Sequence, residues 1–238
     1  MIDASTFAIS FNAFWHAHTP TCEHFVRRLN LHGLDRFYPP MSQFAKTARR
    51  AVIAEYAFSL FVERRNDSVL AGKYASGSHH ESAWSETIRR LEPYANQGLD
   101  VRNHLNEEED REVAELANRL EQFFNRSQPV VLRPIFPGCG YLDASEGDVI
   151  FGSTLYEVKT VERPVRSSDI RQTITYAALN AAFAPSRFEI RSVGLFNPRR
   201  GQCFDIEVEH ICSEISGRPA QELFALIVQA ISSGEISR

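Results

Sequence analysis

Two carboxylates and one ammonium group interrupt an apolar stretch, GDVIFGSTLYEVKTV, at residues 147–161. Asp148 comes directly before Val-Ile-Phe, and Glu157 and Lys159 follow a second apolar run after a short turn. Burying an unpaired ion costs several kcal/mol, so charges within a buried segment must pair with one another or hold a metal ion. These three residues are therefore the first candidates for chemistry.

The spacing of the three charges predicts one shared site. Alternate residues of a strand share a face, so Glu157 and Lys159 point the same way. A tight turn at 151–154 would bring the strand that follows Asp148 back beside Glu157. Two adjacent carboxylates repel unless a cation lies between them, and Mg²⁺ prefers carboxylates, waters and phosphate oxygens. With a lysine to orient or deprotonate a water, this set predicts metal-assisted hydrolysis of a phosphodiester.

The same residues carry a family resemblance. Asp148, eight further residues and then Glu157-Val158-Lys159 resemble the signature of the PD-(D/E)xK nuclease superfamily. In that comparison the two carboxylates bind Mg²⁺ or Mn²⁺, the Val158 carbonyl is a further metal ligand, and Lys159 orients or activates the water. The pattern D…ExK is weak on its own because it arises by chance, and the apolar strands around it strengthen it.

A second element of the resemblance lies downstream. Gln172 and Tyr176 are four residues apart, on one face of a helix predicted over 167–183. They are similar to the QxxxY element of RecB-type and lambda-exonuclease-type members, in which the Gln and Tyr help to place the lysine, the water and the DNA backbone. The β-β-β-α-β order over 129–197 also matches the family core. The resemblance implies an α/β (α+β) fold with a restriction-endonuclease-like mixed central sheet, flanked by helices and preceded by an N-terminal helical region.

The resemblance also implies a further acid or His on a helix before the sheet. We favour Glu55 as this outer ligand for the metal or its water, because it is the only charge in the apolar run 51–62. The alternative for Glu55 is a buried acid paired with an arginine such as Arg50. Glu115, on the helix immediately before the sheet, is the competing candidate.

Basic residues follow the predicted site. Residues 151–200 contain eight Lys or Arg and four Asp or Glu, although the whole chain has a net charge of -4. We expect Arg163, Arg166 and Arg171 to contact the phosphates of DNA. An ordinary solvated face explains the charge excess equally well.

Other constellations are weaker. His16, His18, Cys22 and His24 are zinc-capable, but their spacing fits none of the common closed zinc sites. The four cysteines contain no CxxC, which favours reduced thiols over disulfides or an iron–sulfur cluster. No Walker motif is present, so unwinding or translocation would need a partner such as a helicase or ATPase, or another subunit of a defence system.

The elements that must position the site follow from periodicity and turn signals. We expect helices near 49–65, 83–95, 106–125, 167–183 and 219–232, a loop at 66–82, and strands within 130–136, 147–152, 154–161, 188–197 and 203–209. The expected organisation is an N-terminal extension, 1–48, and a nuclease-like domain, 49–238, with a helical insertion at about 66–127.

Composition agrees with a globular cytoplasmic protein without a membrane segment, since 43% of residues are hydrophobic and 24% are charged. The function that the sequence favours is a Mg²⁺-dependent deoxyribonuclease serving restriction, phage defence, recombination or repair. The alternative from another class is a non-catalytic, nuclease-like subunit that binds DNA or assembles a larger complex. Oligomeric state is left open.

Overall fold

Two compact units make up the chain. The computed structural model describes residues 2–42, 45–69, 77–101, 103–125 and 127–233. The sheet unit comprises Met1–Pro39 and Gln128–Arg238, and the helical unit comprises Pro40–Ser127. This division differs from the expected one. The helix expected to open the nuclease-like domain at residue 49 lies in the helical unit, and most of the expected N-terminal extension lies in the sheet unit.

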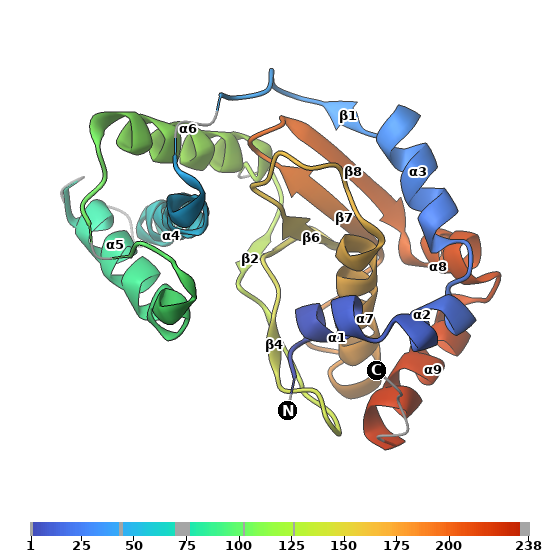
Figure 1. Cartoon of the computed structure of the whole chain (residues 1–238). Coiled ribbons are helices and arrows are strands. Elements are labelled where there is room, and N and C mark those ends of the chain that lie inside the picture. The colour runs from blue at the N-terminus through green and yellow to red at the C-terminus, as the bar shows by residue number, and fades with distance from the viewer. Residues whose placement is uncertain (1, 43–44, 70–76, 102, 126, 234–238) are drawn as a thin grey trace. The chain divides into compact units, whose positions relative to one another are not determined.

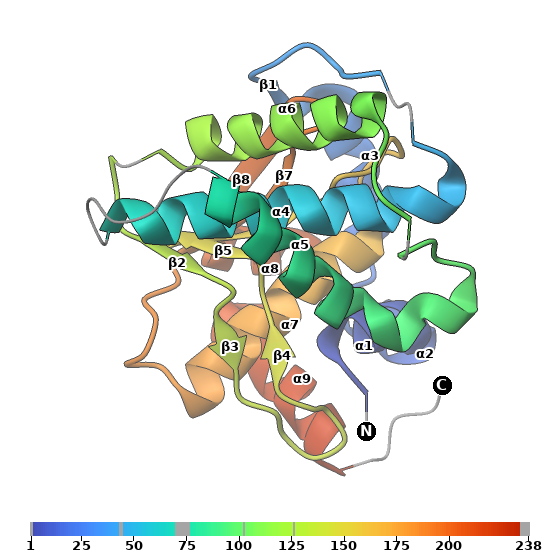
Figure 2. The same ribbon diagram turned by 90° about the vertical axis from the view of Figure 1, so that its left-hand side faces the viewer.

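A mixed six-stranded sheet organises the sheet unit, in the order β1-β8-β7-β6-β5-β2. β6 and β7 are parallel, whereas the other neighbouring strands are antiparallel. A separate two-stranded ribbon pairs β3 with β4 (Figure 2). The fold class is thus mixed α/β, as expected at this level. The strands are β1 (Asp35–Arg36), β2 (Val130–Leu132), β3 (Ile135–Phe136), β4 (Ser145–Glu146), β5 (Val149–Phe151), β6 (Thr154–Val158), β7 (Ser192–Asn197) and β8 (Gln202–Glu207).

The hairpin between β5 and β6 sets the register of the charged residues. Phe151 pairs with Thr154 and Val149 pairs with Tyr156. Gly152 has a φ of 61°, a left-handed conformation that glycine adopts without steric cost and that suits a two-residue hairpin turn. The tight turn expected at 151–154 is therefore present. Its register continues to place Asp148 across from Glu157.

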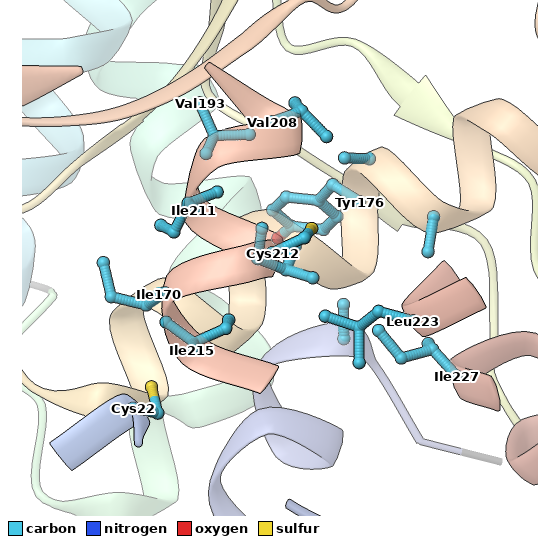
Figure 3. Close-up of a cluster of buried hydrophobic side chains, with 14 of the residues drawn as sticks. Cys22, Ile170, Tyr176, Val193, Val208, Ile211, Cys212, Ile215, Leu223 and Ile227 are labelled. Atoms are coloured by element: carbon cyan, nitrogen blue, oxygen red, sulfur yellow. The ribbon is translucent and has the colours of Figure 1, made fainter. Parts of the chain in front are cut away.

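Helix α7 (Ser167–Phe183) connects β6 to the parallel strand β7 and is covered on both sides. It packs against β6 and β7, while α1 (Ala4–Ser10) and α9 (Ala220–Ser233) pack on it in turn. Figure 3 shows Ile170 and Tyr176 of α7 in one apolar cluster with residues of α8 (Val208–Ser216) and α9. Every residue from Asp169 to Asn180 is buried, so polar side chains on this helix lie in the interior.

The N-terminal segment belongs to the core of the sheet unit. Its helices are α1, α2 (Asn12–His18) and α3 (Cys22–His32), which Figure 1 shows in blue. Phe7 and Trp15 are fully buried, and the Trp15 indole donates a hydrogen bond of 3.0 Å to the Phe7 carbonyl. These three helices were not expected, because the segment 1–48 shows only a mixed sequence without a clear helical pattern.

Three longer helices form the helical unit around buried residues such as Ile53, Leu60 and Leu116. Asn106 caps α6 with a reciprocal capping box, in which its side chain accepts from the Glu109 N–H and the Glu109 side chain accepts from the Asn106 N–H. The elements are η1 (Thr47–Arg49), α4 (Arg50–Val69), α5 (Gly77–Leu91), η2 (Glu92–Gln97) and α6 (Glu107–Phe123). Among the described residues, no helix has both the length and the apolar character needed to cross a membrane.

Two expectations about secondary structure are wrong. The segment 66–82 is not a continuous loop, because α4 runs on to Val69 and α5 begins at Gly77, while residues 70–76 lie outside the described ranges. A polar sequence can continue a helix once packing elsewhere has stabilised it. The sequence also gave no sign of α8, which begins directly after β8 without an intervening turn.

Burial of α7 leads to a stability prediction. Ile174→Ala should lower the free energy of unfolding by about 2–5 kcal/mol, because Ile174 is fully buried in α7 and its loss leaves a cavity. The control is Ile9→Ala at a side chain that is 58% exposed in α1, where the change should stay within about 0.5 kcal/mol. Denaturant unfolding measures both, and equal effects would contradict the described core.

Candidate active site

The two predicted carboxylates lie next to each other at the start of β5 and near the end of β6. The Val158 N–H donates a hydrogen bond of 2.7 Å to Asp148 Oδ2, which fixes the carboxylate of Asp148. Burial, and then the charge of Glu157, raise the pKa of Asp148 well above its ordinary value. Asp148 and Glu157 are therefore close enough for their negative charges to repel each other.

Lys159 connects this acidic pair to helix α7. Its Nζ atom lies 2.9 Å from Glu157 Oε1 and 3.0 Å from Gln172 Oε1. Glu157 and Lys159 thus share one face of the strand, as alternation predicted. Burial alone would lower the pKa of Lys159, but the surrounding carboxylates, Glu157 first, outweigh it and raise that pKa. The ammonium group is therefore held in its charged form by its neighbours.

Gln172 and Tyr176 continue the chain of hydrogen bonds. Gln172 Nε2 donates to the Tyr176 hydroxyl at 2.9 Å, and this hydroxyl donates to the backbone carbonyl of Glu146 at 2.9 Å. Burial, together with the charge of Glu157, raises the pKa of Tyr176, so its phenol stays protonated and available as a donor. The expectation that both residues face the Lys159 end of β6 is confirmed.

The helical period also predicts that Ile170, Ile174, Ala177 and Ala181 pack on the core, and three of these four do so. Ile170, Ile174 and Ala177 pack in the apolar core of the sheet unit. Ala181, expected to join them, is exposed instead. The last turn of α7 extends past the core, so the helical period no longer predicts which of its residues are buried.

The three arginines expected at DNA have different surroundings. Arg166 is exposed at the start of α7. Arg163 is partly exposed and makes two hydrogen bonds to the Asp169 carboxylate, at 2.6 and 2.8 Å. Arg171 is only 4% exposed, and its guanidinium lies 5.7 Å from the centre of the Trp15 ring. A buried guanidinium cannot meet a phosphate at the surface, so the expectation for Arg171 is corrected.

The candidates for a further metal ligand lie in the helical unit. Glu55 Oε1 accepts a hydrogen bond from Ser59 at 3.3 Å and is 3.5 Å from Arg90 Nε. Glu115, on α6, pairs with Arg119 at 2.7 Å, and its side chain is 49% exposed. An arginine thus neighbours each acid. Metal binding by Glu55 or Glu115 stays a prediction.

Three further residues adjoin the site: Arg133 and Asp169, which sequence reasoning did not single out for it, and Glu146, which the sequence offers as an accessory metal ligand or, more readily, as a loop acid. Arg133 has a φ of 50°, unusual for a residue other than glycine, and its N–H donates to the Asp148 carbonyl at 2.8 Å. Its guanidinium is 3.1 Å from the Glu146 carboxylate, which the sequence presents as a loop acid. Asp169 lies 4.0 Å from Lys159 Nζ. Arg133 carried no sequence signal, and the position of Asp169 in the first turn of a predicted helix indicated only a cap.

The donor set at the end of β6 fits a hard divalent cation. Asp148 and Glu157 offer carboxylate oxygens, and the raised pKa of Asp148 marks negative charge that a cation would relieve. In the part of the chain that the structure describes, no three His, Cys, Asp or Glu side chains are grouped to hold a metal. The ligands predicted at this end of β6 are this pair and the Val158 carbonyl, and waters would complete the shell.

Comparisons with known proteins add nothing to this geometry. The chain matches no protein-family model and no curated protein.

The acidic pair leads to a prediction about pH and metal. The raised pKa of Asp148 means that its contribution to stability is present below its unfolded-state pKa, about 4, and is lost as pH rises through the folded-state value. Without metal at neutral pH, Asp148→Asn should therefore raise the Tm, and the gain should shrink toward pH 4. A gain of about 1 kcal/mol would appear as ~2–4 °C.

Thermal unfolding with and without Mg²⁺ checks this prediction. Mg²⁺ should raise the Tm of the unchanged protein and leave Asp148→Asn unaffected. Asp143→Asn, which removes a carboxylate from the preceding loop, is the control. A lower Tm for Asp148→Asn at every pH without metal would contradict the repulsion.

Proposed function

We propose that the chain is a metal-dependent nuclease of the PD-(D/E)xK superfamily that hydrolyses phosphodiester bonds of DNA with Mg²⁺ or Mn²⁺. The environment of Lys159 Nζ carries the proposal: the ammonium group is held between Glu157 Oε1, at 2.9 Å, and Gln172 Oε1, at 3.0 Å. A salt bridge with Glu157 alone would satisfy the charge. The added contact from α7 holds the ammonium at a defined place beside the acidic pair, as a residue that positions a nucleophile requires.

The residues of the chain divide the work. Asp148 and Glu157 hold the metal ion, and the Val158 N–H fixes the Asp148 carboxylate for this purpose. When bound, the ion supplies positive charge for the developing oxyanion. Lys159 has three N–H donors, of which Glu157 and Gln172 each accept one. The third can orient the attacking water.

Tyr176 fixes which way the Gln172 amide points. Its hydroxyl donates to the Glu146 carbonyl, so it must accept from Gln172, and only the NH₂ group of the amide can donate. The amide oxygen of Gln172 therefore faces Lys159. This pair gives the QxxxY spacing a physical role in the proposed site.

DNA as substrate rests on the chemistry of the site, on the resemblance and on the basic segment that follows Lys159. Arg166 is the exposed member of the three expected phosphate contacts. A role in restriction, phage defence, recombination or repair, with a helicase or ATPase as partner, rests on the resemblance alone.

Cleavage itself is the central test. Linear, circular and single-stranded DNA are incubated with Mg²⁺, Mn²⁺ or EDTA, and the products are measured. Lys159→Met should lower the cleavage rate by about 10²- to 10³-fold, the size typical for loss of one preorganised donor. Lys46→Met, at an exposed lysine of the helical unit, should leave it unchanged. Cleavage in EDTA, or by Lys159→Met, would refute the proposal, and DNA binding without cleavage would favour the non-catalytic alternative.

Phosphate contact by Arg166 makes a separate prediction. Each neutralised phosphate releases condensed counterions, so Arg166→Ala should reduce the salt dependence of binding by about one unit of slope on all sequences alike. A salt titration in Ca²⁺, to allow binding without turnover, measures the slope. Arg27→Ala, at an exposed arginine of α3, is the control and should change it less. An unchanged slope for Arg166→Ala would place the DNA path elsewhere.

A further inference from the structure

A further carboxylate, that of Asp169, lies beside Lys159. Asp169 is 3% exposed, and its Oδ1 atom lies 4.0 Å from Lys159 Nζ. Arg163 donates hydrogen bonds to the same carboxylate from both terminal nitrogens, Nη1 at 2.6 Å and Nη2 at 2.8 Å. Two parallel N–H···O bonds fix the plane of a carboxylate as well as its position.

The Asp169 carboxylate also caps the N-terminus of helix α7. Its Oδ2 atom accepts a hydrogen bond of 2.9 Å from the backbone N–H of Arg166, the N-cap residue directly before the helix. A negative charge there is stabilised by the helix dipole as well as by this bond. Gln172 follows less than one turn later. Asp169 thus caps the start of α7 and also lies next to Lys159, which is hydrogen-bonded to Gln172.

Arg163 is already paired with a carboxylate of the same chain, unlike an arginine whose guanidinium is available to bind DNA. Its charge is balanced by Asp169, whose pKa is lowered by the hydrogen bonds from Arg163 and Arg166 against the opposing effect of burial. Lys159, Arg163 and Asp169 also line a cavity of about 20 Å³. A cavity of this size has room for about one water. The anion that this cationic cluster binds is Asp169 itself.

We propose that Asp169, clamped by Arg163, is a positioning residue that holds Lys159 and the start of α7 in one geometry for catalysis. The proposal rests on the proposed nuclease function. Glu157 and Gln172 each accept a hydrogen bond from the ammonium, whereas Asp169, at 4.0 Å, adds a fixed negative charge without taking the third N–H. Without the Asp169 carboxylate, β6 and α7 can shift relative to each other. The N–H of Lys159 that orients the water is then no longer held in the direction that the reaction requires.

The helical unit offers a closely matched control for Asp169→Asn. Glu109 is also the third residue of its helix, is 6% exposed, and accepts from the backbone N–H of Asn106 at 3.2 Å. Arg49 binds it through Nε and Nη2, each at 3.3 Å. Glu109→Gln therefore removes a buried, arginine-bound cap in the same way, in the unit that does not contain Lys159.

Steady-state cleavage and thermal unfolding are measured for the full chain and each variant. Asp169→Asn should lower kcat by about ten- to a hundredfold, with KM changed less than about threefold, because misplacing a group near the chemistry affects the transition state more than binding. Glu109→Gln should lower the Tm comparably and leave kcat within about twofold, since lost stability alone does not change turnover well below the Tm.

Arg163 provides the second variant, which keeps Asp169 and its bond to Arg166. Arg163→Ala should lower kcat about as much as Asp169→Asn, and the double variant should be no worse, because the two residues act as one unit. Arg163→Lys should restore part of the rate. The salt dependence of DNA binding should not change in Arg163→Ala, since Asp169 already neutralises that guanidinium.

The outcomes separate this inference from the proposed function. If the unchanged protein cleaves and Asp169→Asn keeps kcat within about twofold, the inference is overturned while the nuclease proposal stands. If Arg163→Ala flattens the salt dependence by about one unit, Arg163 is a phosphate contact and the inference is also overturned. If the unchanged protein cleaves nothing with Mg²⁺ or Mn²⁺, both fall. Should Asp169→Asn fail to fold, Arg163→Ala carries the test.

Discussion

The ammonium group of Lys159, held where the sheet meets α7, constrains everything around it. A charge that is largely shielded from solvent must be matched by acceptors in fixed places, because few waters can reach it. Glu157, on β6, and Gln172, on α7, each accept a hydrogen bond from this ammonium group. Tyr176 in turn holds the Gln172 amide, and the backbone carbonyl of Glu146 holds Tyr176. One cation therefore accounts for two of the polar side chains, Gln172 and Tyr176, in the buried helix α7.

That polar line needs a rigid support, and the N-terminal aromatic residues help to supply it. Helix α7 is covered by the sheet on one side and by α1 and α9 on another, so it cannot move without disturbing two layers. Phe7 and Trp15 seal one end of this packing. The cost is that Arg171 must lie inside, where the Trp15 ring and the Asn12 side chain contact its guanidinium. Packing that holds Gln172 in place thus also removes a positive charge from the surface.

The parts of the site that follow from short-range geometry could be predicted from the sequence. Alternation along a strand placed Glu157 and Lys159 on one face, a glycine turn brought Asp148 back beside them, and i, i+4 spacing aligned Gln172 with Tyr176. The parts that depend on tertiary contacts could not. An arginine reads as a surface residue until an aromatic ring far away in the sequence covers it, as for Arg171. Likewise, the helical N-terminal segment looked like an extension because its partners lie more than a hundred residues away, as in the bond from the Ala4 N–H to Ser145.

The pairing of β1 with β8 has a consequence for how the nascent chain acquires its structure. Asp35 pairs with Cys203, and the entire helical unit lies between them in the sequence. The ribosome therefore releases β1 and the three N-terminal helices long before their partners exist. The helical unit has its own core and local contacts, so it can collapse first, whereas the sheet closes only after β8 has emerged. Until then, the apolar faces of α1–α3 stay uncovered, and this interval is when the chain is most exposed to aggregation and to chaperones.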